Sequence, residues 1–161
     1  LNYYGKTKLE AENMLIGSNR KFIIIRPNVL FSYKDNNFFT FIYKNLLNNN
    51  LLNIVTDQIS NPVYVPSLST IILELILLDC EGIFHFGTDK NISRYDFALK
   101  IAKKFKFNEK LLNPILTKDL HQTAQRPLNT TLNCDKIEKY LDINLDSIDN
   151  NLQKIKKIYD E

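Results

Sequence analysis

The feature that most constrains the fold is a short run rich in isoleucine, Phe22 to Arg26, which Pro27 ends. An apolar run without alternation predicts a strand buried on both faces, as is typical of parallel sheets. A second such run, Gly82 to Gly87, is bounded by glycine at both ends. Helical segments separate the two runs. This alternation predicts an α/β fold.

Apolar residues at helical spacing predict the helices, over residues 2–16, 37–47, 66–78, 133–141 and 147–159, and one that begins after Ser93. Ser93 and Asp96 predict a capping box at the start of that helix. Segments 51–55 and 113–117 predict further short strands. The residues predicted to face inward from the third helix are Leu68, Ile72, Leu75 and Ile76. The stripe predicted on the last helix is Ile148, Leu152, Ile155 and Tyr159.

Tyr4 and Lys8 form the sharpest local pattern. On a helix they lie about one turn apart on the same side, together with Ala11 and Leu15, which predicts a buried apolar face around Lys8. A neighbouring cation favours the phenolate and lowers the pKa of a tyrosine. Such a tyrosine can donate a proton to a carbonyl oxygen as hydride reaches the carbon. Taken alone, the spacing also arises by chance in helices.

Five segments in order resemble the extended short-chain dehydrogenase/reductase family, and within it the dTDP-4-dehydrorhamnose reductases and related sugar-nucleotide reductases. The first segment is Tyr4-x-x-x-Lys8 with the strand that ends in Arg26-Pro27-Asn28. The others begin at Asp57 (Asp-Gln-Ile-Ser-Asn-Pro-Val-Tyr-Val), Gly82 (Gly-Ile-Phe-His-Phe-Gly), Ile92 (Ile-Ser-Arg-Tyr-Asp-Phe-Ala) and Ala124 (Ala-Gln-Arg-Pro-Leu-Asn-Thr-Thr-Leu).

This resemblance implies the C-terminal part of a Rossmann-type NAD(P)-binding fold plus a small substrate-binding subdomain. The Rossmann-type part is expected at about residues 1–36 and 66–90, interleaved with substrate-binding segments at about 37–65 and 91–161. The N-terminal nucleotide-binding half is expected to be absent, because none of the four glycines forms the Gly-rich turn that holds a dinucleotide. The chain is therefore expected to be a piece that binds the cofactor poorly by itself.

The resemblance also implies roles for individual residues. Tyr4 would be the general acid that protonates the C4 keto oxygen of a 4-keto-6-deoxy sugar nucleotide. Lys8 would lower the pKa of Tyr4 and hold the ribose hydroxyls of NADP or NAD. Pro27 and Asn28 would lie near the nicotinamide.

Four further residues are implied to border the sugar nucleotide: Asp57, Gln58, Pro62 and Arg126. Arg126 could bind a substrate phosphate, to which a planar guanidinium is suited, or form an ion pair that fixes the C-terminal segment. Asp57 could instead be a loop cap. Arg26 and His85 are interpreted as structural residues. No metal site is expected, because the Cys and His residues lack metal-ligand spacing.

The sequence departs from the rhamnose-pathway pattern in two places. Pro27-Asn28-Val29 stands where the relatives commonly carry Thr-Ser-Trp, and Val63 replaces a threonine. The loss of an aromatic residue that can stack on a sugar ring weakens the assignment of that particular sugar. The broader class of sugar-nucleotide enzymes remains.

Three functions stay open. The first is NAD(P)H-dependent reduction of a 4-keto-6-deoxy sugar nucleotide. The second is a non-catalytic, nucleotide-binding regulatory subunit of the methionine adenosyltransferase beta type, which the retained Tyr4–Lys8 pair argues against. The third is a sugar-nucleotide epimerase or dehydratase that uses the same pair without net oxidation.

Composition excludes other classes. A chain of 161 residues with 44% apolar residues can form a real core, and two cysteines exclude a disulfide scaffold. A net charge of +3 without a basic cluster does not indicate nucleic-acid binding. The longest apolar stretch, Leu68 to Leu78, is too short to cross a bilayer. We therefore expect a cytoplasmic protein. The resemblance implies three partners: a sugar nucleotide, a second copy as a homodimer, and a complementary N-terminal half.

Overall fold

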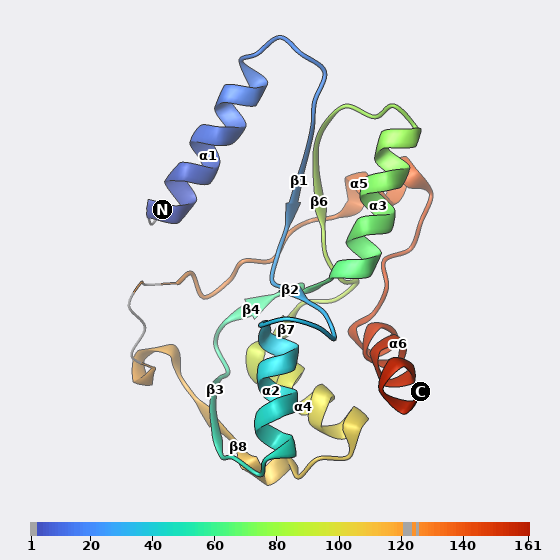
Figure 1. The fold of residues 1–161 in the computed structure, drawn as a ribbon. Coiled ribbons are helices and arrows are strands. Elements are labelled where there is room, and N and C mark those ends of the chain that lie inside the picture. Colours follow the sequence, from blue (N-terminus) through green and yellow to red (C-terminus); the bar gives the residue numbers. More distant parts are fainter. Residues whose placement is uncertain (1–2, 121–123, 125) are drawn as a thin grey trace.

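A computed structural model describes residues 3–120, 124 and 126–161 of the chain. The chain begins with helix α1 (Tyr3–Ile16) and strand β1 (Ile23–Pro27) and ends with helix α6 (Ile148–Asp160) (Figure 1). The remaining helices are α2 (Phe38–Leu47), α3 (Val65–Leu77), α4 (Arg94–Phe105) and α5 (Asp135–Leu141). The remaining strands are β2 (Leu30–Phe31), β3 (Leu52–Val55), β4 (Ile59–Ser60), β5 (Val63–Tyr64), β6 (Gly82–Phe86), β7 (Ile92–Ser93) and β8 (Leu112–Ile115).

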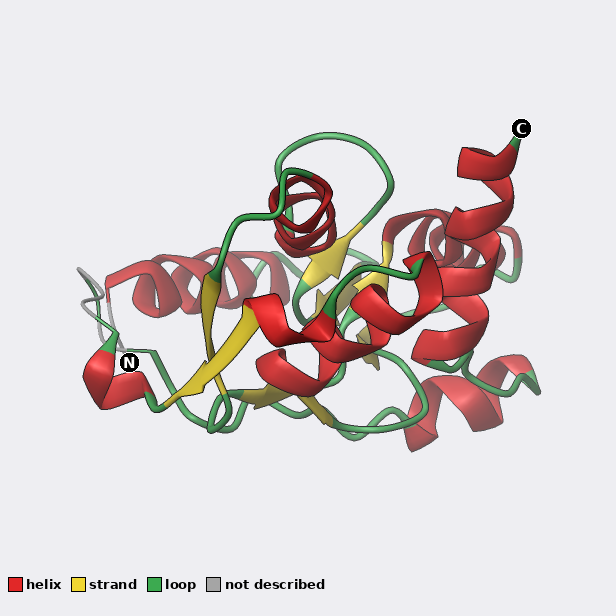
Figure 2. Cartoon of the chain, turned by 90° about the horizontal axis from the view of Figure 1, so that it is seen from below, coloured by secondary structure: helices red, strands yellow, loops and turns green. Residues whose placement is uncertain are grey.

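The described strands form two-stranded sheets, and most of the pairs are parallel. β1 pairs with β6 from Ile23↔Gly82 to Pro27↔Phe86, while β2–β5 and β3–β8 are also parallel. Only β4 and β7 pair antiparallel among the described strands. Figure 2 shows these short strands between the helices. The α/β fold predicted from the alternating segments is confirmed.

Two apolar cores hold the elements together. One lies where α2, α4 and α6 meet β3, and its fully buried side chains include Phe39, Ile101 and Leu152. The other lies between α3, α5 and β6, around Leu75, Phe84 and Ile137. The division of the chain into two interleaved functional parts remains a prediction.

Local signals in the sequence fix several element boundaries. The Ser93 side chain accepts a hydrogen bond from the backbone N–H of Asp96 (3.0 Å), so the predicted cap of α4 is confirmed. Asn37 caps α2 in the same way, in a reciprocal capping box with Thr40.

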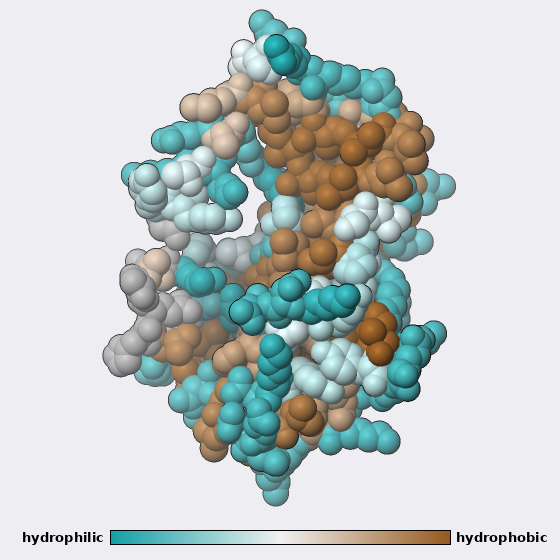
Figure 3. All heavy atoms as spheres, viewed as in Figure 1, coloured by the Kyte–Doolittle hydropathy of each residue, from teal (hydrophilic) through white to brown (hydrophobic). Residues whose placement is uncertain are grey.

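The inward face predicted for α3 is wrong in part. Leu68 and Leu75 are buried as expected, but Ile72 is 39% exposed and Ile76 is 58% exposed, and Ile71 takes the inward position. The helix meets the core along Leu68, Ile71 and Leu75, which are spaced three and four apart. The flank with Ile72 and Ile76 is left uncovered. Figure 3 shows apolar atoms gathered on this face of the molecule, over α3.

The buried face predicted for α1 is also wrong. No side chain of α1 is buried, and Ala11 and Leu15 are exposed. α1 lies beside β1, away from the two cores (Figure 1). The apolar side that the periodicity predicts for α1 therefore exists, but no other described part of the chain buries it.

Candidate active site

Tyr4 and Lys8 lie side by side in the first turns of α1. The Lys8 Nζ is 5.6 Å from the centroid of the Tyr4 ring, so the expected proximity of cation and phenol is confirmed. Tyr4 is 69% exposed and Lys8 is exposed. The Thr7 hydroxyl donates to the Tyr4 carbonyl oxygen (2.9 Å) and holds the turn between them. The phenol is therefore accessible from solvent beside an ammonium group.

The amino end of α1 lies level with the carboxyl end of β1, because helix and strand run in opposite directions (Figure 1). Pro27, the last residue of β1, is exposed. In open α/β sheets the carboxyl ends of the strands border the ligand crevice. Tyr4, Lys8 and Pro27 therefore lie on the side of the fold where a ligand is expected.

Asn28 follows Pro27 but is engaged in the protein's own hydrogen bonds. Its Nδ2 donates to the Asn61 side chain (3.1 Å) and to the carbonyl oxygen of Thr130. Its Oδ1 accepts from the backbone N–H of Val29 (2.9 Å) and from the Thr130 hydroxyl (3.3 Å). The structure thus gives Asn28 a role in joining the end of β1 to the segment that follows Arg126.

Asn61 is the centre of this network, and the sequence analysis assigned it no role. It is 2% exposed. Its Nδ2 donates to the carbonyl oxygen of Leu132 (3.0 Å), and its Oδ1 accepts from the Leu132 N–H (3.1 Å). Gly87 packs so closely that a Cβ there would lie 2.3 Å from the Asn61 Nδ2. The position of Asn61 within the Asp57–Val65 segment was the only signal in the sequence.

Asp57 and Gln58 both contact Thr117, which begins a short 3-10 turn over Thr117–Asp119. The Asp57 carboxylate accepts from the Thr117 hydroxyl (2.7 Å) and backbone N–H (3.0 Å). These bonds, the hydroxyl bond foremost, lower the pKa of Asp57. Gln58 is 5% exposed and its Nε2 donates to the same hydroxyl (3.1 Å). These contacts correspond to the alternative in which Asp57 caps a loop.

Pro62 follows Asn61 in the chain and is buried. It lines a cavity of about 240 Å³ between α3, the end of β6 and the loop before α6. Asp57, Gln58 and Asn28 do not line this cavity. No contact recorded among the described residues joins Pro62 to the Tyr4–Lys8 pair.

Arg126 is exposed, and its positive charge acts on Arg94 at the start of α4. Burial lowers the pKa of Arg94, and the charge of Arg126 lowers it further. The Arg94 guanidinium lies 5.2 Å from the Phe38 ring. Neither arginine forms a salt bridge with an acidic group in the described ranges. The ion pair considered for Arg126 is therefore not seen there, and Arg94 is a second candidate that the sequence analysis missed.

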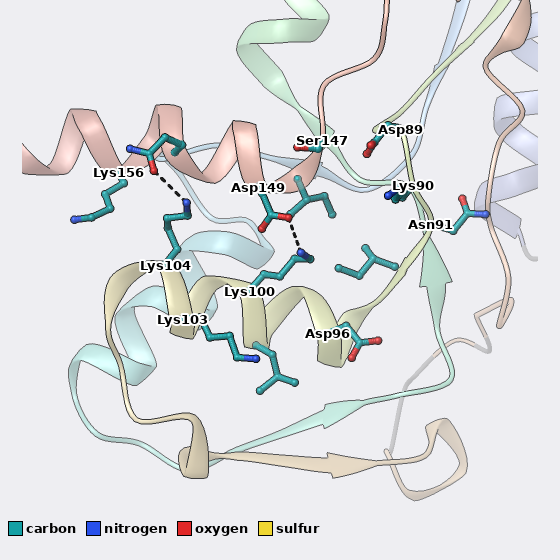
Figure 4. Close-up of a pocket in the computed structure, with 14 residues that line it drawn as sticks. Asp89, Lys90, Asn91, Asp96, Lys100, Lys103, Lys104, Ser147, Asp149 and Lys156 are labelled. Atoms are coloured by element: carbon teal, nitrogen blue, oxygen red, sulfur yellow. Dashed lines mark hydrogen bonds and ion pairs between the residues drawn. The ribbon is translucent and has the colours of Figure 1, made fainter.

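Figure 4 shows a different hollow, of about 870 Å³, between α4 and α6. None of the predicted site residues lines it. Its lysines are largely occupied within the protein: Lys100 pairs with Asp149 (2.6 Å), and Lys104 donates to Gln153 (3.1 Å). Although this hollow is large, we do not take it as the candidate active site, because it contains none of the predicted site residues.

Two kinds of feature are absent from the described part of the chain. No group of three or more His, Cys, Asp or Glu residues there could hold a metal ion. No helix there combines the length and the apolar character needed to cross a membrane.

Comparisons with known proteins identify the family of the chain. A family model for the RmlD substrate binding domain matches residues 1–160. A dTDP-4-dehydrorhamnose reductase from Aggregatibacter actinomycetemcomitans is 33% identical over 147 residues, which cover 84% of this chain and 50% of that protein. A methionine adenosyltransferase 2 subunit beta from Xenopus tropicalis is 29% identical over 148 residues, with 86% and 44% covered.

Among solved structures, a dTDP-4-dehydrorhamnose reductase from Bacillus anthracis in complex with NADP has a TM-score of 0.90 and 23% identity, and covers 96% of this chain and 55% of that chain. The parallel α/β fold is therefore of the Rossmann type. The chain spans about half the length of the curated relatives it matches. It belongs to the RmlD substrate-binding domain family.

Proposed function

We propose that the chain supplies the catalytic Tyr4–Lys8 pair and the substrate-binding part of an NAD(P)H-dependent sugar-nucleotide reductase. The substrate class is a 4-keto-6-deoxy sugar nucleotide. The observation that carries the proposal is the exposed Tyr4 phenol beside Lys8, 5.6 Å from ring centroid to Nζ, in a chain of this family. The curated reductase that is 33% identical supports the same reaction class.

In this proposal Tyr4 donates its proton to the keto oxygen of the sugar, and Lys8 favours the phenolate that remains. The nicotinamide cofactor supplies the hydride when bound. Lys8 is also the candidate for contacts to its ribose, and Pro27 for contacts near its nicotinamide. NADP is supported by the complex of the related reductase, which was solved with it. No described glycine forms a cradle for the pyrophosphate, because Gly5, Gly17, Gly82 and Gly87 lie far apart along the chain.

A complementary nucleotide-binding half is the partner that this activity requires, on the same polypeptide or a separate one. Two features support it. β1 pairs with β6 on one edge and with no other described strand. α1 buries no side chain. An added parallel strand could pair with the free side of β1 and pack against α1. A second copy, as a homodimer, stays a further proposal.

Arg94 and Arg126 are proposed to receive the diphosphate of the substrate. Two guanidinium groups that act on each other without a described acidic partner suit an anion with several oxygens. Asp57 and Gln58 are proposed to border the sugar through the loop they fix to Thr117. Pro62 is proposed to shape the same loop from its buried side.

The test is reduction of a 4-keto-6-deoxy sugar nucleotide by the chain joined to a nucleotide-binding half, followed as oxidation of NADPH or NADH. Tyr4→Phe should keep cofactor binding and lose about 10²–10⁴-fold in turnover, the range for removing a general acid. Tyr3→Phe is the matched control, because Tyr3 is 83% exposed on the same helix. Undiminished turnover in Tyr4→Phe would remove Tyr4 from the mechanism. Turnover of a sugar nucleotide without net NAD(P)H oxidation would favour an epimerase or dehydratase.

The second candidate is a regulatory subunit, which the similarity to methionine adenosyltransferase 2 subunit beta supports. Such a subunit needs the fold without the proton transfer. Co-purification with a methionine adenosyltransferase catalytic subunit, together with no NAD(P)H oxidation on keto sugars, would favour it over the reductase.

A further inference from the structure

α1 carries the proposed catalytic pair, yet it buries no side chain against the rest of the chain. With so little burial, polar contacts matter for its orientation. Glu12, four residues after Lys8, provides one toward β1, and Tyr4, Lys8 and Glu12 follow one side of the helix because each is four residues from the next.

The Glu12 carboxylate forms a two-pronged ion pair with Arg26 of β1. The Arg26 Nε donates to both carboxylate oxygens (2.9 and 3.1 Å), and Nη2 donates to Oε2 as well. The Glu12 side chain is 19% exposed and that of Arg26 is 39% exposed. Because a planar guanidinium binds the carboxylate through two N–H groups, it fixes the relative orientation of the two side chains as well as their distance. A single ammonium contact fixes only the distance.

The contact continues across the sheet. Arg26 and His85 are register partners on β1 and β6, and Arg26 Nη1 lies 3.4 Å from His85 Nε2. His85 Nδ1 lies 3.2 Å from the carbonyl oxygen of Asn133. A tautomer that donates from Nδ1 to Asn133 leaves Nε2 to accept from Arg26, an assignment based on the partners. Glu12 is thereby connected through Arg26 and His85 to the segment before α5.

We propose that Glu12 and Arg26 are positioning residues that set the orientation of α1, and with it the Tyr4 phenol and the Lys8 ammonium, relative to the carboxyl end of β1. His85 supports Arg26 from the neighbouring strand. The inference rests on the proposed function for its catalytic consequence, whereas its structural part, the orientation of α1, stands independently.

The pair is charged in the folded protein. The hydrogen bonds from Arg26 lower the pKa of Glu12, and Glu12 raises the pKa of Arg26. Ion pairs near solvent add little to global stability. A stability measurement alone therefore does not test the proposal, and the experiment has to follow the helix itself.

The first arm measures amide hydrogen exchange over α1 in the 161-residue chain, by mass spectrometry. Arg26→Lys keeps the charge but removes the two-pronged geometry and the contact with His85, and Glu12→Gln removes the charge with little change in shape. Both variants should exchange about tenfold faster over α1, the factor expected on losing a hydrogen bond to a charged group. Exchange in α4 should stay unchanged, which shows that the fold is intact.

Two further variants make this arm specific. Asp79→Asn breaks another exposed ion pair, between Lys21 and Asp79, and should leave α1 exchange at the parent rate. The charge-swapped double variant Glu12→Arg/Arg26→Glu should recover protection relative to either single change. Unchanged α1 exchange in both Arg26→Lys and Glu12→Gln would overturn the proposal, as would an equal increase in Asp79→Asn.

The second arm uses the chain joined to a nucleotide-binding half. Arg26→Lys should lower kcat about tenfold with KM for the sugar nucleotide unchanged, because the proton donor is misplaced while the substrate-binding segments stay intact. A proportional change in KM instead would overturn a positioning role. If the parent shows no reductase activity, the proposed function fails, and the exchange result still decides whether Glu12 and Arg26 orient α1.

Discussion

The amide of Asn61 should be one of the most sensitive polar groups in this chain. It is 2% exposed and satisfies both main-chain groups of Leu132, at 3.0 and 3.1 Å. It also accepts from Asn28 (3.1 Å). Asn61→Ala would remove the partner of both Leu132 main-chain groups and one of the two acceptors of the Asn28 Nδ2.

The magnitude follows from the groups that lose a partner. Each buried polar group left unsatisfied costs about 1–3 kcal/mol. Leu132 is only partly buried, so water can satisfy some of the loss, and we expect the free energy of unfolding to fall by about 3 kcal/mol. For a chain of this size that corresponds to a decrease of roughly 6–12 °C in Tm.

Urea and thermal unfolding followed by circular dichroism measure this loss. The matched control is Asn113→Ala, because Asn113 donates to Asn53 (2.7 Å) at the surface. Surface changes of this kind cost less than about 0.5 kcal/mol. A free energy of unfolding for Asn61→Ala within about 0.5 kcal/mol of the parent value would contradict this role of Asn61, as would an equal loss of unfolding free energy in the two variants.

Three other predictions concern single groups. Gly87→Ala should destabilise the fold by about 2 kcal/mol or more in urea unfolding, because the added Cβ would lie 2.3 Å from the Asn61 Nδ2. Gly17→Ala is the control and should cost far less, because the nearest atom to its added Cβ is 3.3 Å away. The lowered pKa of Asp57 contributes stability that is present above its unfolded value of 3.8 and is lost as the pH falls through the folded value. Asp57→Asn should therefore show a shallower loss of stability on acidification than the parent, and equal acid limbs would contradict this. Burial, with the negative charge of Glu138, raises the pKa of Cys134 to about 11, so its thiol should react with an alkylating reagent at neutral pH only after unfolding; fast labelling of the native chain would contradict the buried position.

Local patterns predicted the elements that depend on neighbouring residues. The strand at Phe22 to Arg26 and the cap at Ser93 need only a few adjacent side chains, and both are found in the structure. The stripe on α6 is confirmed for Ile148, Leu152 and Ile155, which are buried. Tyr159 at the end of the stripe is 40% exposed, although its ring lies 4.6 Å from that of Tyr43.

Patterns that depend on distant partners were not predictable. The periodicity of α1 indicates an apolar face but does not say whether anything in the chain covers it. Strands of two residues, such as β2 and β5, carry no period at all. The Asn28–Asn61–Leu132 network joins three segments that are separated by 33 and 71 residues, and no spacing rule connects them.

In the candidate site, too, local contacts were predictable from the sequence and long-range contacts were not. Proximity of Tyr4 and Lys8 follows from helix geometry and was predictable. The partner of Asp57, Thr117, lies 60 residues away, and the electrostatic interaction of Arg94 with Arg126 depends on how the start of α4 meets a segment about 30 residues further along the chain. These contacts needed the three-dimensional structure.

The unpaired side of β1 has a practical consequence. Among the described strands, β1 (Ile23–Pro27) pairs with β6 only, so the amide and carbonyl groups on its other side are open to an extended peptide. Such a strand is a template for aggregation. Purified by itself at high concentration, the chain should form oligomers that light scattering detects, and co-expression with a nucleotide-binding half should suppress them.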